Sequence, residues 1–179
     1  MTRYTMRFAT PDDTAALADL SRDSFCAAFA HLYREEDLGA FLKSAYAPEA
    51  IAAQIADPKR LYRLAVGEDG TLLAYCKLVL ESEYAEHSDA RNPLGLGQLY
   101  TAPGMTGSGL GAALMEWALD EARERGCDAI QLSVWSENYG AQRFYQRYGF
   151  AKIADIDFWV GSHRDDEFLY ELKLDGVPG

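Results

Sequence analysis

The alternation of hydrophobic and polar positions predicts a short strand near the start of the chain. Tyr4, Met6 and Phe8 are separated by polar residues, which is the period of two that a half-buried strand shows. The segment 10–13 that follows reads Thr-Pro-Asp-Asp. It offers a capping residue, a proline suited to the first helical turn and two acids that favour the positive end of a helix dipole. The chain therefore opens with a strand that leads into a helix.

The same reading along the rest of the chain gives an ordered series of helices and strands. Further helices are predicted over residues 35–46, 48–56, 110–125 and 138–148. Further strands are predicted over residues 61–66, 71–80, 94–101, 129–135, 151–160 and 167–174. Turn residues at 67–70 and 161–165 make hairpins of the strands on either side. This order predicts an α/β (α+β) fold in a single domain over residues 1–179. Its core would be one mixed, mostly antiparallel central sheet of about seven strands flanked by helices.

A glycine-rich turn joins the strand at 94–101 to the helix at 110–125. Residues 103–112 read Pro-Gly-Met-Thr-Gly-Ser-Gly-Leu-Gly-Ala, and alternate glycines let a backbone come close to a ligand. The free N–H groups at the start of a helix favour phosphate. No lysine follows as in a Walker A loop, and the spacing GxGxG late in the chain does not match a dinucleotide-binding fingerprint. The alternative is that the glycines only allow the strand and the helix to pack tightly.

A second segment favours a ligand-binding role for that turn. Residues 138–150 read Asn-Tyr-Gly-Ala-Gln-Arg-Phe-Tyr-Gln-Arg-Tyr-Gly-Phe, which matches N-x-x-A-x-x-F-Y-x-x-x-G-F at every position. Together the two segments resemble the acetyl-CoA-binding half of the GNAT superfamily of N-acetyltransferases, whose loop reads Q/R-x-x-G-x-G/A. Thr106 stands where the family usually has Gln or Arg, so pyrophosphate binding would depend more on backbone N–H groups. The resemblance implies a GNAT-like acyl-CoA N-acyltransferase fold and acetyl-CoA as co-substrate, with no metal.

The resemblance also implies roles for individual positions. The backbone of Leu99, Tyr100 and Thr101 would pair with the pantetheine arm of the cofactor. Asn138 would bond to that arm through its side chain, and Ala141 would leave room for it. The pyrophosphate would lie on the consecutive residues Thr106, Gly107, Ser108, Gly109, Leu110, Gly111 and Ala112.

Tyr145 is the catalytic candidate, because in the family this position lies near the sulfur and protonates the leaving thiolate. A phenol of ordinary pKa, about 10, can give a proton to a thiolate of similar basicity. A neutral amine attacks a thioester directly, so the reaction needs no covalent enzyme intermediate. Backbone N–H groups freed by a bulge near Gly97 would stabilise the developing oxyanion. The alternative for Tyr145 is a half-buried aromatic residue of the helix.

Two other segments resemble the bacterial spermidine/spermine N-acetyltransferase branch of the superfamily. They are residues 25–46 and the run Phe-Trp-Val-Gly at 158–161. In this fold the loop between the first helices covers the acceptor, so His31, Tyr33 and Glu36 would line it. Each has an equally simple alternative: a helix-end cap for His31, a core position for Tyr33 and a helix-dipole partner for Glu36.

Two more features bear on the acceptor. Trp135 ends a strand beside the cofactor segment and would also lie against the acceptor. Glu81 and Glu83 are candidates for the base that deprotonates the amine, and Glu83 is also a candidate acceptor contact. The alternative is a solvated acidic loop, and the base is not assigned from the sequence.

Composition narrows the class of partner. The chain has 17 Lys and Arg against 28 Asp and Glu, a net charge of −11 at pH 7. Such a chain is a poor candidate for binding nucleic acid or an anionic membrane and suits a cationic acceptor, although an acidic surface also promotes solubility. The three cysteines, Cys26, Cys76 and Cys127, are isolated from one another and form no CxxC pair, which indicates a reducing, cytoplasmic location.

These observations predict transfer of an acetyl group from acetyl-CoA to a primary amine of a small molecule. A polyamine is the leading acceptor, and the amine would attack directly in a ternary complex. The alternatives are an amino acid, an antibiotic amine or a protein N-terminus as acceptor, and a non-catalytic acyl-CoA-binding module. Dimers are common in the superfamily, so the resemblance extends to a homodimer.

Overall fold

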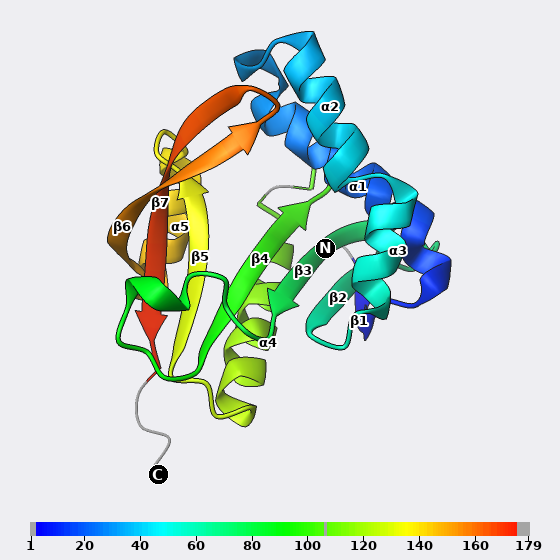
Figure 1. The fold of residues 1–179 in the computed structure, drawn as a ribbon. Coiled ribbons are helices and arrows are strands. Elements are labelled where there is room, and N and C mark those ends of the chain that lie inside the picture. The colour runs from blue at the N-terminus through cyan, green and yellow to red at the C-terminus, as the bar shows by residue number, and fades with distance from the viewer. Residues whose placement is uncertain (1–2, 106, 175–179) are drawn as a thin grey trace.

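A computed structural model of the protein describes residues 3–105 and 107–174, in which seven strands form one sheet (Figure 1). The strands are β1 (Tyr4–Phe8), β2 (Arg60–Gly67), β3 (Leu72–Val79), β4 (Pro93–Thr101), β5 (Ala129–Trp135), β6 (Ala151–Val160) and β7 (His163–Lys173). They lie in the order β1-β2-β3-β4-β5-β7-β6. Strands β4 and β5 are parallel, and the other neighbouring pairs are antiparallel. The predicted mixed, mostly antiparallel sheet is confirmed.

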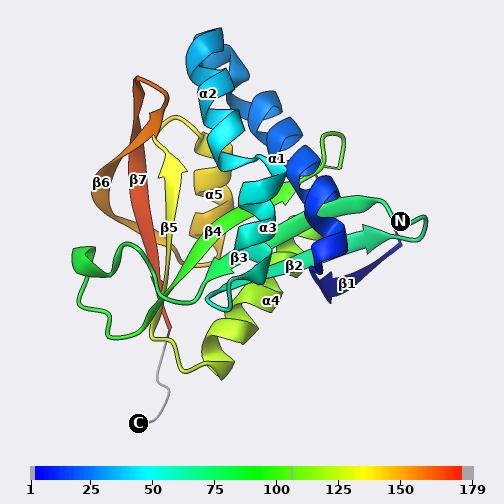
Figure 2. The ribbon, with the colours of Figure 1, turned by 45° about the vertical axis from the view of Figure 1, so that its right-hand side comes forward.

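Helices cover both faces of this sheet. They are α1 (Thr14–Phe29), α2 (Glu35–Ala45), α3 (Pro48–Ala56), α4 (Leu110–Glu124) and α5 (Tyr139–Arg147). Figures 1 and 2 show α1 and α3 in front of β2 and β3, with α4 behind the sheet. The buried side chains accordingly form two clusters. One lies between α4 and the sheet and the other beneath α1 and α3. Short 3-10 turns precede and follow α1 and interrupt the loop before β4.

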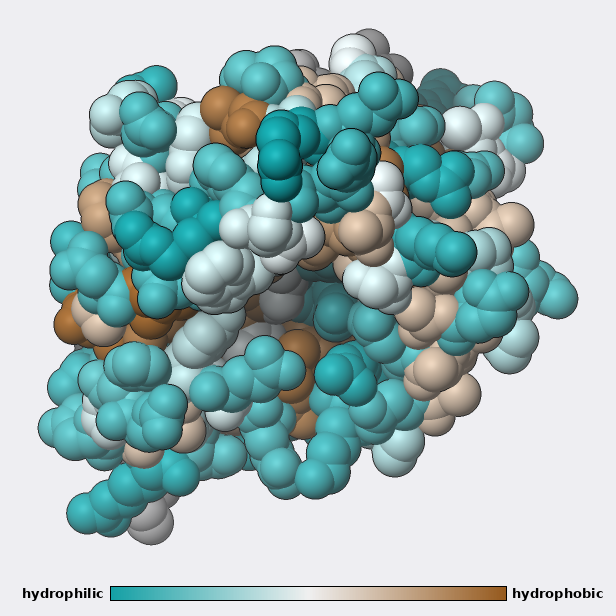
Figure 3. All heavy atoms as spheres, turned by 45° about the horizontal axis from the view of Figure 1, so that its top comes forward, coloured by the Kyte–Doolittle hydropathy of each residue, from teal (hydrophilic) through white to brown (hydrophobic). Residues whose placement is uncertain are grey.

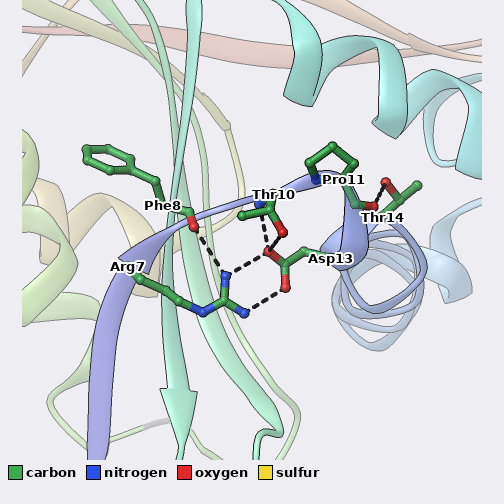
Figure 4. Close-up of polar contacts among 6 residues, drawn as sticks. All are labelled: Arg7, Phe8, Thr10, Pro11, Asp13 and Thr14. Carbon is green, nitrogen blue, oxygen red and sulfur yellow. Dashed lines mark hydrogen bonds and ion pairs between the residues drawn. The ribbon is translucent and has the colours of Figure 1, made fainter.

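The first strand is tied directly to the start of the first helix (Figure 4). Residues Pro11–Asp13 form a 3-10 turn, and the Asp13 carboxylate accepts a hydrogen bond from the backbone N–H of Thr10 at 2.7 Å. The guanidinium group of Arg7 donates to both oxygens of Asp13 at 2.8 Å. This ion pair lowers the pKa of Asp13 and keeps the carboxylate charged at the end of the turn. The predicted strand-to-helix start is confirmed.

Strands β4 and β5 pair over three residues and then separate. Residues 93–95 lie opposite residues 129–131. Beyond them the register between β3 and β4 shifts, and Gly97 has no partner in β3. An extra residue of this kind bends a strand and increases its twist. Figures 1 and 2 show the two strands diverging from there, so the edge of β4 over residues 97–101 faces a gap rather than β5.

The β6–β7 hairpin is tighter than predicted, because β7 begins at His163 and the connection is only two residues long. The expected turn over 161–165 was therefore wrong at its C-terminal end. Asp37 of α2 holds the short connection: its Oδ1 accepts from the backbone N–H and the Oγ of Ser162, both at 2.9 Å. Gly161 has a φ of +57°, and a Cβ there would lie 2.7 Å from the Cα of Asp37. Only glycine fits so close to α2, and the hairpin is thereby fixed to that helix.

Asp37→Asn is expected to lower the stability of the fold at pH 7 and to make it less sensitive to acid. Hydrogen bonds from Ser162, and then from Arg34, lower the pKa of Asp37 to about 2, below its unfolded value of about 3.9. A carboxyl group with a depressed pKa stabilises the fold above the unfolded pKa and loses that contribution as the pH falls through the folded one. The variant lacks this titration. Urea unfolding between pH 7 and pH 2 tests the expectation.

The matched control is Asp120→Asn, which removes an exposed carboxylate from α4. It should follow the wild type at every pH. Equal acid sensitivity of the wild type and Asp37→Asn would contradict the role given to Asp37.

Candidate active site

A cleft of about 1150 Å³ opens where β4 and β5 separate. Its lining residues fall into two groups. One group comes from β4, the glycine turn, the start of α4 and helix α5, and the other from α1, the second half of α2, the end of β5, the end of β6 and the start of β7. Figure 3 shows the molecule hollowed near the centre of the face that comes forward when the top of Figure 1 is tilted toward the viewer. One cleft thus joins the glycine turn and the segment 138–150 to the N-terminal helices.

The glycine turn forms one end of this cleft. Gly107 and Gly109 have φ angles of +80° and +86°, and a Cβ at either position would meet no atom within 4 Å. Tight packing therefore does not explain these two glycines, whereas the left-handed backbone does. Gly109 caps α4, whose first N–H groups have no partner within the helix. Thr106 lies outside the described residues. The turn presents backbone donors and the positive end of a helix dipole, which together suit an anion.

Helix α5 forms the adjacent wall. The Asn138 side chain accepts the N–H of Ala141 at 3.2 Å and so caps the helix. This bond uses the amide oxygen and leaves the amide NH₂ for another partner. Ala141 and Tyr145 both line the cleft one turn apart. In the described part of the chain, no hydrogen-bond partner is present for the Tyr145 hydroxyl. Burial raises the pKa of this phenol above its ordinary value, so it carries its proton at neutral pH.

A chain of hydrogen bonds fixes the bulged segment of β4 from beneath. The Tyr75 hydroxyl donates to Gln98 at 2.8 Å and lies 2.6 Å from the hydroxyl of Ser21. The amide of Gln98 donates to Tyr46 at 3.3 Å, and the Tyr46 hydroxyl lies 3.4 Å from that of Tyr100. Ser21, Tyr75 and Tyr46 are buried. Buried, mutually satisfied polar groups hold a single geometry, so this network sets the position of the β4 edge along the cleft.

Aromatic rings and carboxylates form the other end of the cleft. The rings of Phe29 and Trp135 meet edge to face at 5.8 Å. The Tyr33 hydroxyl donates to Asp165, and Nε2 of His163 lies 3.0 Å from the other oxygen of Asp165. An apolar surface with a few placed polar groups is typical of a small-molecule site.

Two acids of β7, Asp165 and Glu167, face this end together. They are two residues apart on one strand, so both side chains point to the same face of the sheet. Each is 8% exposed, and both line the cleft. Burial, and then the charge of Asp165, raise the pKa of Glu167 to about 8. Burial also lowers the pKa of Lys77, another lining residue, to about 8. Glu167 and Lys77, two groups whose pKa values lie this close to neutrality, mark a candidate functional site.

The structure gathers most of the predicted site residues but not all of them. Those that line the cleft are Leu99, Tyr100, Thr101, Gly107, Ser108, Gly109, Leu110, Gly111, Ala112, Asn138, Ala141, Tyr145, Tyr33 and Trp135. His31, Glu36 and Glu83 lie outside that lining and are exposed. Glu36 belongs to the acidic first turn of α2, where a carboxylate faces the helix dipole. Glu81 is exposed and pairs with Lys59 at 3.1 Å.

Sequence reasoning missed Asp165, Glu167 and Lys77 as lining residues. The signal for the first two was the period of two: Asp165, Glu167 and the buried Leu169 alternate with other residues along β7. Placing residues 161–165 in a turn hid that pattern. Lys77 gave no signal, because a single lysine in a strand is ordinarily solvated.

Over 3–105 and 107–174, no helix combines the length and the apolar character that crossing a membrane requires. Over the same residues, no three His, Cys, Asp or Glu side chains are grouped so that they could hold a metal ion. The cytoplasmic location and the homodimer stay predictions.

The chain is similar in sequence to known N-acetyltransferases. The sequence profile of the acetyltransferase (GNAT) family matches residues 19–150. An uncharacterized N-acetyltransferase in the pepI 3' region of Lactobacillus delbrueckii subsp. lactis is 30% identical over 155 residues, which cover 87% of this chain and 88% of the relative. Aminoalkylphosphonate N-acetyltransferase of Salmonella typhimurium is 31% identical over 147 residues, which cover 81% of this chain and 83% of that relative.

The fold has close counterparts among solved structures. The PaiA N-acetyltransferase of Thermoplasma acidophilum, crystallised in complex with coenzyme A, superimposes with a TM-score of 0.78 over 96% of this chain and 99% of its own. Its sequence identity of 22% limits the likeness to the fold.

Proposed function

This chain belongs to the acetyltransferase (GNAT) family, and on that premise we propose that its cleft holds acetyl-CoA and a small primary amine together in a ternary complex. The observation that carries the proposal is the continuity of the cleft, which joins the glycine turn, Tyr145 and the buried carboxylates of β7. Direct attack requires both reactants to be held in contact, and a continuous cleft allows this. We infer that residues 1–179 act as one catalytic domain.

Binding of the cofactor is proposed to depend mainly on backbone groups. The edge of β4 over residues 97–101 faces away from β3 into the gap and can pair with an extended pantetheine arm. The N-terminus of α4 and the turn before it suit the pyrophosphate. Because coenzyme A is a polyanion and the chain has a net charge of −11, the attraction has to be local. Arg147 lines the cleft and is the basic side chain of α5 placed to add to it.

Tyr145 is the proposed acid. Acetyl-CoA supplies a thioester whose sulfur needs a proton as it leaves. The Tyr145 phenol lines the cleft, its hydroxyl has no partner in the described residues, and its raised pKa keeps it protonated at neutral pH. A positioned acid of this kind contributes about 10²- to 10⁴-fold to a rate.

A polyamine is the proposed acceptor. Asp165 and Glu167 place acidic groups at the far end of the cleft from the glycine turn, which suits a cationic amine and disfavours an anionic one. The name of the Salmonella typhimurium relative specifies an aminoalkylphosphonate, which carries an anionic group. The acceptor proposed for this chain is therefore of a different kind.

An amine panel tests this function. Thiol release from acetyl-CoA is expected with spermidine and spermine. It is expected to be weaker with an amino acid, an aminoglycoside or an aminoalkylphosphonate. The KM for the polyamine should rise with salt, because the attraction to the acidic end is screened. A KM that does not depend on salt would contradict the polyamine assignment. Coenzyme A binding with no turnover on any amine would instead favour a non-catalytic acyl-CoA-binding module.

A further inference from the structure

Glu167 is a largely buried acid at the end of the cleft that we assign to the acceptor, here called the acceptor end. Asp165 has two partners, the Tyr33 hydroxyl and the His163 ring. The Glu167 carboxylate has neither a hydrogen bond nor an ion pair within the described residues, although it is only 8% exposed and lines the cleft. Partial removal of a carboxylate from water has a cost that a bound donor offsets. Because Glu167 lines the cleft, a donor that enters through the cleft can bind it.

We propose that Glu167 binds the ammonium group of the acceptor and takes its proton before attack, with Asp165, on the same face of β7, as a positioning residue. The inference rests on the proposed function, and it assigns the base that the sequence left open. The other acids considered for that role do not reach the site, because Glu81 and Glu83 are exposed and lie outside the cleft lining.

Among the groups around Glu167, Asp165 is the charged neighbour that acts on it. The charge of Glu167 contributes to the raised pKa of Tyr33 after α1, of Tyr84 in the loop before β4 and of Tyr100 on β4. Burial raises the pKa of each of these phenols, so all three are neutral where the enzyme works. The paired strands β5 and β6 place Trp135 and Ile156 opposite Glu167, and neither titrates.

This arrangement gives Glu167 a pKa suited to a base. Burial and the like charge of Asp165 raise that pKa to about 8. A carboxylate this basic accepts a proton from an ammonium group more readily than an exposed glutamate does. An incoming cation in turn favours the charged form of Glu167, so acceptor binding ionises the base.

The proton balance of the transfer is complete with these residues. Glu167 takes one proton from the ammonium, and the neutral nitrogen forms its bond to the acetyl carbon. The carbon–sulfur bond breaks, and Tyr145 donates its proton to the sulfur. Tyr145 recovers a proton from the acylated nitrogen, and Glu167 releases the first proton to solvent. The net products are an amide, a free thiol and one proton.

The same geometry restricts the substrate class. An acceptor with an anionic group next to its amine would bring a third negative charge against Asp165 and Glu167. Like charges placed together in a site cost binding energy. Amines on uncharged or cationic skeletons are therefore favoured, and the amide of an amino acid should be acetylated faster than the free acid.

The test is the pH dependence of kcat/KM for the wild type, Glu167→Gln and Asp165→Asn. The kcat/KM of the wild type should rise with pH through about pH 8. This rising limb of the profile should stay at the same pH when an acceptor amine of different pKa is used. Glu167→Gln should lower kcat/KM about 10²-fold and remove the limb. Asp165→Asn should keep the limb but move it to lower pH, because the like charge that raises the pKa of Glu167 is gone. Coenzyme A affinity should be unchanged in both variants.

The matched control is Asp166→Asn, which removes the exposed carboxylate between the two acids and outside the cleft lining. Its profile should equal that of the wild type. A wild-type rate and limb in Glu167→Gln, or a limb in Asp165→Asn that does not move, would overturn this inference while leaving the proposed function intact. Absence of any acetylation by the wild type would overturn both.

Discussion

Tyr145→Phe is expected to lower kcat by about 10²- to 10⁴-fold while leaving the affinity for coenzyme A close to that of the wild type. The substitution removes one hydroxyl group and keeps the ring that packs edge to face against Phe144 and Phe150. The variant therefore keeps the wall of the cleft but lacks the hydroxyl that would donate the proton. Thiol release measures the rate, and calorimetric titration with coenzyme A measures the affinity.

Tyr148→Phe is the matched control. Tyr148 follows α5 directly and contacts the ring of Phe144, but it is not among the residues that line the cleft. Its loss of a hydroxyl group should leave kcat unchanged. An unchanged kcat in Tyr145→Phe would remove Tyr145 from the role of acid and leave it as an aromatic of the cleft wall.

Ala141→Leu is expected to weaken coenzyme A binding by about ten- to a hundredfold. Ala141 lines the cleft beside the helix cap, and a leucine there projects three more carbon atoms into the space proposed for the pantetheine arm. Inserting such volume at a packed contact costs about 1–3 kcal/mol, and every 1.4 kcal/mol or so is tenfold in affinity. Alanine and leucine are both strong helix formers, so α5 itself should persist.

Two readouts separate occlusion from unfolding in that variant. The melting temperature should stay near the wild-type value while the dissociation constant for coenzyme A rises. Tyr139→Leu, at a position of α5 that is 60% exposed and outside the cleft lining, should change neither. If Ala141→Leu bound coenzyme A as tightly as the wild type, this wall of the cleft would not be the pantetheine site.

Much of the fold was predictable because its signals are local. Period-two and helical spacing located the strands and helices to within a few residues, and glycines fixed several of their ends. The bulge in β4 was foreseen from Gly97, which has no side chain to pack in the ladder. Both segments that carried the family resemblance line the same cleft.

The acceptor end was less predictable because it is assembled from distant parts of the chain. Tyr33 and Asp165 meet across 132 residues, and Asp37 reaches Ser162 across 125. A sequence pattern does not reveal such pairings, and it does not tell which way a side chain in a loop or first helical turn points. That is why His31 and Glu36 were grouped with Tyr33, although only Tyr33 faces the cleft.

The measurement that tests the central claim most directly is an initial-rate study of thiol release with spermidine, in which the concentrations of both substrates are varied and the amine product is weighed by mass spectrometry. If the cleft holds both substrates at once, the reciprocal plots intersect and each thiol released is matched by one acetylated amine. Parallel plots with an acetyl group found on the protein, or coenzyme A binding without thiol release on any amine, would contradict it.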